Sequence, residues 1–134
     1  TIDAPIDRHR LQRTKMTVVF SGKPAVTQYR LTETTAHFAW LDVKLETGRT
    51  HQIRVHMTHI GHPLVGDPVY RQGRLGLGHA TREVRALIDG FPRQALHARR
   101  LGLIHPTRDE PVEFEAPIAS DLIDLLIALK DVDV

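Results

Sequence analysis

The stretch Glu46–Tyr70, ETGRTHQIRVHMTHIGHPLVGDPVY, decides the fold because it joins a turn, a short helix and an ordered loop. Thr47-Gly48 is a turn dipeptide that ends an alternating strand. Residues 50–60 then have the pattern of one short helix. Thr50 is expected to cap its N-terminus through the side-chain oxygen, and Gly61 stands where a helix commonly stops.

The helix predicted at residues 50–60 has one apolar stripe and a cationic neighbouring face. Three side chains at positions i, i+4 and i+7 form the stripe: Ile53, Met57 and Ile60. Arg54 falls on a neighbouring face of the helix, with its charge free to reach out of that stripe. In the following loop, Asp67 stands between Gly and Pro, a context typical of a turn-former. So many polar groups on a short helix and its loop indicate a functional site.

The rest of the chain alternates short strands with helices. Residues 1–13 show little periodicity and predict an extended arm. Strands are predicted at residues 16–20, 25–31, 37–46 and 112–116, and residues 99–104 are predicted to form a strand or a helical turn that runs into a strand. The first two of these strands are expected to pair through a turn at residues 21–24. Further helices are predicted at residues 81–88, capped by Thr81, and after Ser120, which is expected to cap the last helix.

Strands and helices in this order predict an α+β fold, with a mixed, mainly antiparallel sheet and a few flanking helices. The glycine-rich residues 71–78 predict a loop and are a candidate RNA-facing segment. At 134 residues the chain is one domain at most, with enough length for a single core.

The composition excludes several classes of protein. With no cysteine, the chain has neither a disulfide nor a thiolate metal site. No apolar run approaches the roughly 20 residues that a membrane-spanning helix needs. The chain begins at Thr1 without a Met or a recognisable signal peptide, so we expect a fragment or a processed product, located in the cytoplasm.

Charge is divided unevenly along the chain, although the formal net charge is only +2. Residues 1–108 contain 17 Lys and Arg against 8 Asp and Glu, a net +9. Residues 109–134 contain 1 basic and 8 acidic residues, a net −7. A basic body of this kind indicates contact with a polyanion. A merely solvated, arginine-rich surface explains the same charge equally well.

The histidines and serines give no complete motif for metal binding or hydrolysis. Four histidines fall within twelve positions: His51, His56, His59 and His62. No H-E-x-x-H accompanies them, so local hydrogen bonding or phosphate binding explains them better than a zinc site does. Neither G-x-S-x-G nor a phosphate-binding G-x-x-x-x-G-K-[ST] loop occurs. We therefore expect no metal.

The quoted stretch resembles the signature of the RluA-type RNA pseudouridine synthases, in particular the ribosomal large subunit pseudouridine synthase D branch. RQALHARRLGLIHP followed by EFEAP is similar to that family's next block, and GKPAVTQYRL resembles the strand pair before the signature. The resemblance covers nearly the whole chain. It implies that residues 1–134 form the C-terminal portion of a pseudouridine synthase catalytic domain, a single partial domain.

The resemblance assigns roles to particular residues. Arg54, in HQIRVH, matches the arginine that pairs with the family's catalytic aspartate, and Leu96, in QALHA, matches the apolar residue that packs against the target uracil. A guanidinium holds a carboxylate ionised and orients it through two parallel hydrogen bonds. Four neighbours are candidates for positioning RNA or the loop, with a purely structural role equally open: Arg49, Thr50, His51 and Gln52.

The family's catalytic aspartate belongs to an HRLD-x-x-TSG-like motif, which this sequence lacks, since His9-Arg10-Leu11 is followed by Gln12. The family's base-stacking tyrosine also has no counterpart, because Tyr29 and Tyr70 lie in other blocks. The resemblance implies that the parent enzyme isomerises uridine to pseudouridine in large-subunit ribosomal RNA without a cofactor. Residues 1–134 alone are expected to be inactive. Two alternatives remain open, a non-catalytic RNA-binding module and a histidine metalloprotein.

Overall fold

The structure is a computed structural model that describes residues 1–71 and 77–134. Its elements, in chain order, are β1 (Ile2–Asp3), β2 (Ile6–Arg8), β3 (Met16–Val18), β4 (Val26–Thr34), β5 (Ala39–Leu45), α1 (Gln52–His59), α2 (Arg82–Asp89), β6 (Arg100–Ile104), β7 (Pro111–Glu115) and α3 (Ser120–Val132). The described strands form one three-stranded and two two-stranded sheets, all antiparallel. The predicted α+β class is confirmed, with the sheet divided into three parts.

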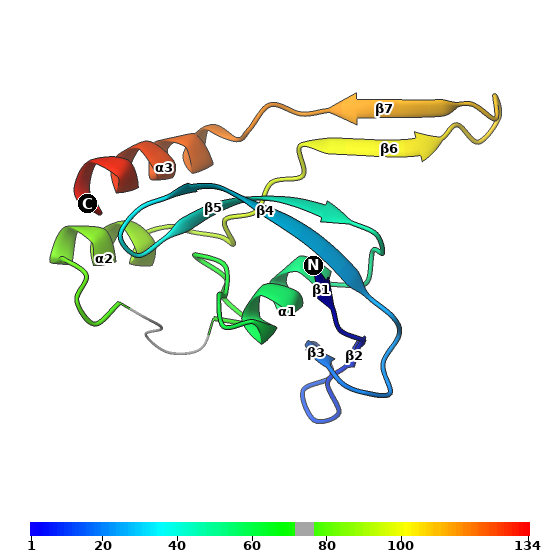
Figure 1. The fold of residues 1–134 in the computed structure, drawn as a ribbon, viewed down its shortest axis with the longest axis horizontal. Helices are drawn as coiled ribbons and strands as arrows, with labels where there is room; N and C mark the ends of the chain where they lie inside the picture. Colours follow the sequence, from blue (N-terminus) through cyan, green and yellow to red (C-terminus); the bar gives the residue numbers. More distant parts are fainter. Residues whose placement is uncertain (72–76) are drawn as a thin grey trace.

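The largest sheet has the order β1-β4-β5, and α1 packs beneath it (Figure 1). The predicted stripe of α1 faces the core, because Met57 is buried and Ile53 and Ile60 pack with it. Leu41 and Val43 of β5 belong to the same cluster, so alternation along β5 supplies the other side of the contact. This packing fixes α1 against the sheet.

The N-terminal residues are part of the core rather than an arm. Ile2, Ala4 and Ile6 are buried, which is the period of two that a half-buried strand shows. β1 pairs with β4, and β2 pairs with β3. The expected hairpin between residues 16–20 and 25–31 is therefore wrong. The N-terminal segment lies between β3 and β4 instead, because its strands β2 and β1 pair with them.

The helix ends confirm some of the predicted caps and correct others. Thr81 caps α2 by accepting the N–H of Val84 at 3.2 Å, and Gly61 follows α1 with a φ of +87°. Thr50 does not cap α1, because His51 occupies the N-cap position with a φ of 56° and makes no side-chain cap. Ser120 is the first residue of α3 rather than its cap.

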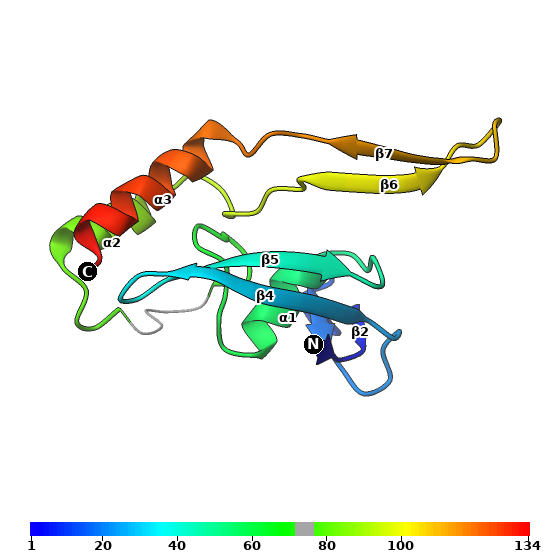
Figure 2. The same ribbon diagram turned by 45° about the horizontal axis from the view of Figure 1, so that its top comes forward.

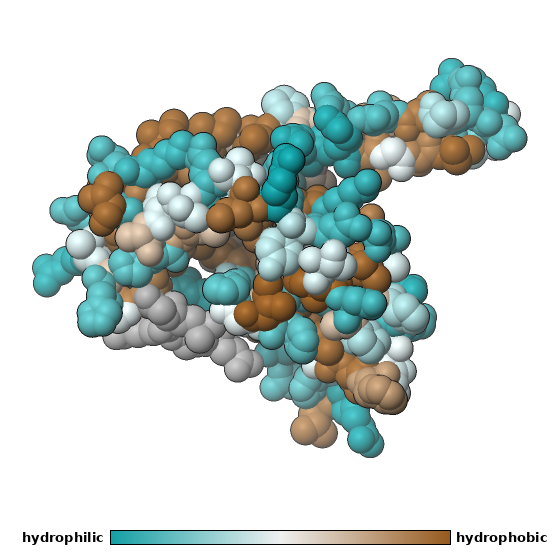
Figure 3. All heavy atoms as spheres, viewed as in Figure 1, coloured by the Kyte–Doolittle hydropathy of each residue, from teal (hydrophilic) through white to brown (hydrophobic). Residues whose placement is uncertain are grey.

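The C-terminal part forms a second packed region and a projecting ribbon. α2 and α3 pack through Val84, Ile88 and Leu129. β6 and β7 pair with each other and extend away from the body (Figure 2). Hydrophobic atoms are exposed on this ribbon and over α3 (Figure 3), where the exposed residues include Leu101, Phe114 and Ile127. Of the predicted loop at residues 71–78, residues 72–76 lie outside the described residues.

Candidate active site

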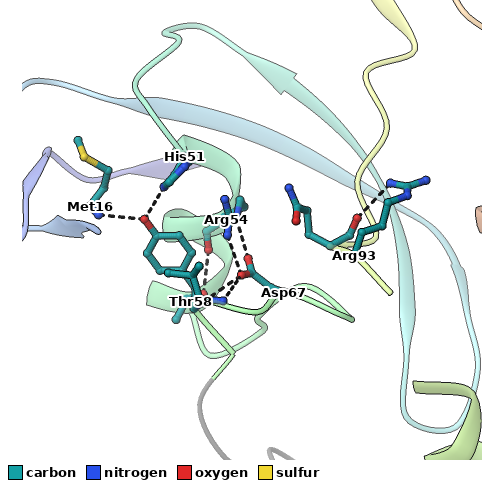
Figure 4. A network of polar contacts seen from close by, with 9 residues as sticks. Met16, His51, Arg54, Thr58, Asp67 and Arg93 are labelled. Atoms are coloured by element: carbon teal, nitrogen blue, oxygen red, sulfur yellow. Dashed lines mark hydrogen bonds and ion pairs between the residues drawn. The ribbon is translucent and has the colours of Figure 1, made fainter. Parts of the chain in front are cut away.

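The Arg54 side chain of α1 is buried and paired. Its Nε and Nη2 donate to Asp67 Oδ2 and Oδ1 at 2.8 and 2.9 Å, so the two groups form a bidentate ion pair (Figure 4). Only 10% of the Arg54 side chain and none of the Asp67 side chain is exposed. Asp67 therefore meets the Arg54 charge inside the protein.

Asp67 is both this ion-pair partner and the turn-former that its sequence context predicts. Its Oδ1 also accepts the backbone N–H groups of Val69 and Tyr70, at 2.9 and 3.1 Å. Gly66 precedes it with a φ of +75°, and a Cβ at that position would lie 2.0 Å from the carbonyl oxygen of Arg93. Only glycine fits both this backbone conformation and this close approach. The loop therefore fixes Asp67 where it can reach α1.

The charges of the pair are stable at neutral pH. Burial would raise the pKa of Asp67, but hydrogen bonds from Arg54 and from the N–H groups of Tyr70 and Val69 outweigh it, so the pKa lies below its ordinary value of 3.8. The hydrogen bond with Asp67 raises the pKa of Arg54, against the opposing effect of burial. Both groups are ionised, and each balances the charge of the other.

Tyr70 supports the face of the same guanidinium. The Cζ atom of Arg54 lies 4.9 Å from the centroid of the Tyr70 ring, a cation–π contact. The Tyr70 hydroxyl accepts the N–H of Met16 at 2.9 Å and lies 2.7 Å from His51 Nδ1. Tyr70 is itself buried, in a cluster with Val55. The network therefore connects α1, the loop after it and β3.

His51 stands at the N-terminal end of α1 with a backbone conformation that is uncommon for a residue other than glycine. Burial and, next, the charge of Arg54 lower the pKa of His51, with Asp67 opposing them in part. The ring is therefore neutral at pH 7. The Tyr70 hydroxyl has no other acceptor among the described residues, so we assign its proton to His51 Nδ1 and the ring proton to Nε2.

Gln52 is occupied by the scaffold. Its Nε2 donates to the backbone oxygen of Val26 and to Thr27 Oγ1, both at 3.0 Å. Its Oε1 accepts from Thr47 Oγ1 at 2.7 Å and from the N–H of Arg49 at 2.9 Å. A glutamine amide has two donors and two acceptor positions, and all four are used. Of the two roles that the sequence leaves open, the geometry supports the structural one.

The two other residues predicted near the helix start are more accessible. Arg49 donates from Nε to the backbone oxygen of Pro24 at 2.8 Å, which holds the stem of its side chain against the turn before β4. Thr50 is exposed. Both keep polar atoms that an RNA strand could contact.

Leu96 lies on a segment that is attached to the Asp67 loop. The N–H of Ala95 donates to the backbone oxygen of Val65 at 2.8 Å, and Arg93 Nη1 donates to the backbone oxygen of Leu96 at 3.2 Å. The Leu96 side chain is half-buried. The loop at residues 64–70 thus has Arg54 attached on one side and the Leu96 segment on the other.

The clustered histidines have separate environments. His56 is fully buried, with Nδ1 2.7 Å from Thr27 Oγ1 and Nε2 2.8 Å from the backbone oxygen of Ala4. His59 and His62 are exposed. Within residues 1–71 and 77–134, no three His, Asp or Glu side chains are grouped to hold a metal ion. In the same ranges, no helix is both long and apolar enough to cross a membrane.

Residues 1–59 match the family model described as RNA pseudouridylate synthase. The ribosomal large subunit pseudouridine synthase D of Pseudomonas aeruginosa is 53% identical over 131 residues, which are 97% of this chain and 41% of that protein. The chain is therefore similar to RNA pseudouridylate synthases over nearly its whole length. The synthase D of Haemophilus influenzae is 48% identical over 130 residues, or 97% of this chain and 40% of that protein.

Two solved structures are similar to this chain in fold and in sequence. Human RNA pseudouridylate synthase domain containing 1 matches with a TM-score of 0.66 and 28% identity, over 96% of this chain and 58% of that chain. Human RNA pseudouridylate synthase domain containing 4 matches with a TM-score of 0.67 and 26% identity, over 96% and 55%. The chain spans about two fifths of the length of the curated relatives named above.

The sequence pattern does not identify the two residues that contact the Arg54 guanidinium. The context of Asp67 predicts only a turn-former, and Tyr70 belongs to no recognised motif position. The separation of 13 residues between Arg54 and Asp67 carries no local signal. The only signal in the sequence is the paired Gly and Pro residues around Asp67, which mark a loop of fixed conformation.

Proposed function

We propose that the whole protein to which this chain belongs isomerises uridine to pseudouridine in large-subunit ribosomal RNA. The names of its bacterial relatives state this activity for those proteins. In this chain, the supporting observation is the buried guanidinium of Arg54, which Asp67 fixes along one edge. A guanidinium held in this way can keep a catalytic carboxylate ionised and oriented.

The reaction breaks the N1–C1′ glycosidic bond of uridine, turns the base and forms a C5–C1′ bond. The C5 proton leaves and N1 gains a proton, so the product is an isomer and no co-reactant is consumed. An ionised carboxylate begins the reaction, and Arg54 favours its charged form. Leu96 offers an apolar surface on which the uracil can turn without losing hydrogen bonds. The target nucleotide leaves its stack to reach the site.

We place the reacting carboxylate in a segment of the whole protein outside residues 1–134, because the HRLD-x-x-TSG-like motif does not occur here. These residues would then be the C-terminal portion of a larger catalytic domain. The apolar residues exposed on β6 and β7 support this proposal, since a two-stranded ribbon alone is only marginally stable in water. The share of the relatives that the chain spans supports it as well.

Release of tritium from RNA that carries 5-tritiated uridine tests the proposal, because the C5 hydrogen is lost during the reaction. The whole protein should release tritium from a large-subunit ribosomal RNA transcript, and residues 1–134 alone should release none above background. Turnover by residues 1–134 alone would show that a carboxylate within them does the chemistry. No turnover by the whole protein on any large-subunit segment would contradict the proposed function.

A non-catalytic RNA-binding module is the second candidate, and the net +9 of residues 1–108 favours it. Lys and Arg contacts to phosphates release counterions, so binding should weaken steeply between low and physiological salt. Tight, salt-dependent binding by the whole protein without tritium release would support this candidate over the synthase. An enzyme of ribosomal RNA works where that RNA is, so a cytoplasmic location is part of the main proposal.

A further inference from the structure

We propose that Asp67 is a positioning residue, which holds one edge of the Arg54 guanidinium so that the opposite edge faces a second anionic group. This inference rests on the proposed function, in which the second group is the catalytic carboxylate. Asp67 does not itself contact that group or the RNA. It acts through Arg54, whose orientation and effective charge it sets.

The donors of Arg54 divide into a used edge and an open edge. A guanidinium carries five N–H groups in one plane. Asp67 takes the N–H of Nε and one N–H of Nη2. Among the described residues, no side-chain or backbone acceptor takes the remaining N–H groups of Nη1 and Nη2. Those two nitrogens share an edge, and an edge of this kind can hold a second carboxylate bidentately.

The guanidinium cannot turn that open edge elsewhere. Its face rests against the Tyr70 ring, 4.9 Å away. Asp67 is fixed in turn by the N–H groups of Val69 and Tyr70. The N–H of Ala95 donates to the backbone oxygen of Val65 at 2.8 Å and holds the loop in place. Four separate contacts thus determine one orientation, which is the condition for a group that must meet its partner without reorganising.

Asp67 also sets the charge that the second carboxylate meets. Paired with Asp67, Arg54 contributes almost no net charge, whereas an unpaired Arg54 would contribute a full positive charge. The titratable groups that face the pair from α1 and the loop are His51, which is neutral, and Tyr70. Removing the Asp67 charge should therefore lower the pKa of the catalytic carboxylate. The acid limb of the rate profile, which is the fall in rate as the pH drops and the catalytic carboxylate is protonated, should therefore move to lower pH.

The test uses Asp67→Asn and Asp67→Glu in the whole protein. Asparagine keeps an oxygen for the two backbone N–H groups but loses the charge, so it preserves the turn and removes the ion pair. Glutamate keeps the charge but displaces it. Single-turnover tritium release is measured against pH for each variant. The folded fraction of each variant is measured at every pH by circular dichroism, and rates are expressed per folded molecule, so that partial unfolding in acid is not mistaken for a shift of the limb.

We expect Asp67→Asn to lower the maximal rate by about tenfold to a hundredfold and to move the acid limb down by about one pH unit. Asp67→Glu should lower the rate without moving the limb. Asp133→Asn, which removes another buried carboxylate that accepts a backbone N–H, is the matched control and should leave both unchanged. His51→Gln should leave the limb in place, which shows that the limb does not report the histidine.

An unmoved acid limb in Asp67→Asn, with a near-normal rate, would overturn the positioning role and leave Asp67 as a turn-former. In that case an inactive Arg54→Lys variant would still support the proposed function. Near-normal turnover in Arg54→Lys and Arg54→Ala would instead remove the role of Arg54 in the proposed function, and the inference with it. The two failures are therefore distinguishable.

Discussion

Two arginines of this chain hold an aspartate with the same pair of nitrogens. Arg54 donates from Nε and Nη2 to Asp67, and Arg93 donates from Nε and Nη2 to Asp121, at 3.0 and 2.7 Å. The Arg54 pair is buried, whereas the side chains of Arg93 and Asp121 are 37% and 42% exposed. The two ion pairs therefore have the same hydrogen-bond geometry but differ in how far they are buried.

The two pairs also differ in what the third guanidinium nitrogen, Nη1, contacts. Nη1 of Arg93 donates to the backbone oxygens of Gln94 and Leu96, both at 3.2 Å, so that guanidinium is committed to the fold. The corresponding edge of Arg54 has no acceptor among the described residues. Water screens the exposed pair and would hydrate either charge after a mutation, but it cannot reach the buried pair in this way. Burial should therefore make the Arg54–Asp67 pair sensitive to mutation, whereas the exposed Arg93–Asp121 pair should tolerate it.

Arg54→Ala should have the largest effect of any change at these pairs. It strands the buried carboxylate of Asp67, which should lower the free energy of unfolding by about 3–5 kcal/mol. Loss of about 4 kcal/mol of transition-state stabilisation would lower turnover about a thousandfold. Urea unfolding and single-turnover rates measure the two effects. Arg93→Ala is the matched comparison and should cost much less stability, and equal losses at the two sites would refute the role given to burial.

Tyr70→Phe should have the next largest effect. The variant keeps the ring beneath Arg54 but removes the hydroxyl that accepts the N–H of Met16 and reaches His51, which should cost about 1–3 kcal/mol of stability. Turnover should fall less than in Arg54→Ala. Thermal unfolding checks this, with Tyr29→Phe as the control, because the Tyr29 hydroxyl has no partner among the described residues. A Tyr70→Phe variant as stable as its control would show that the hydroxyl is not structurally important.

Acidification should weaken the buried region in two stages. The pKa of His51 is lowered on folding, so the unfolded chain binds a proton at higher pH, and stability present above pH 6.5 falls as the pH drops below it. The pKa of Asp67 is also lowered, so a second loss begins near its ordinary value of 3.8. Unfolding in urea across pH 3 to 8 measures both. His51→Gln should remove the first stage alone, and persistence of that stage would assign it to another group.

Salt should have the smallest effect and should separate the two pairs directly. About 0.5 M salt shortens the screening length to a few ångströms, which weakens exposed pairs more than buried ones. The difference in stability between the wild-type protein and Asp121→Asn should shrink as salt is added. The corresponding difference for Asp67→Asn should stay nearly constant. If both differences shrink together, the Arg54 pair is more accessible to solvent than its burial indicates.

The sequence alone determined the elements that depend on local pattern. The alternation at residues 39–45, the stripe of Ile53, Met57 and Ile60, and the end of α1 before Gly61 all follow from neighbours within a few positions. Hydrophobic period and glycine conformation are properties of the segment itself, so they can be read without the fold. The same holds for the Thr81 cap, whose partner Val84 is three residues away.

Tertiary structure decided the contacts between distant segments. β3 pairs with β2 rather than with β4, because burial of Ile2, Ala4 and Ile6 places the N-terminus between them. Likewise Arg54 meets Asp67 only because Gly66 can approach the Arg93 backbone and turn the loop back onto α1. A sequence pattern records which residues prefer to be buried or to turn. It does not record which of several compatible partners they reach, because that choice depends on packing the whole chain into one core.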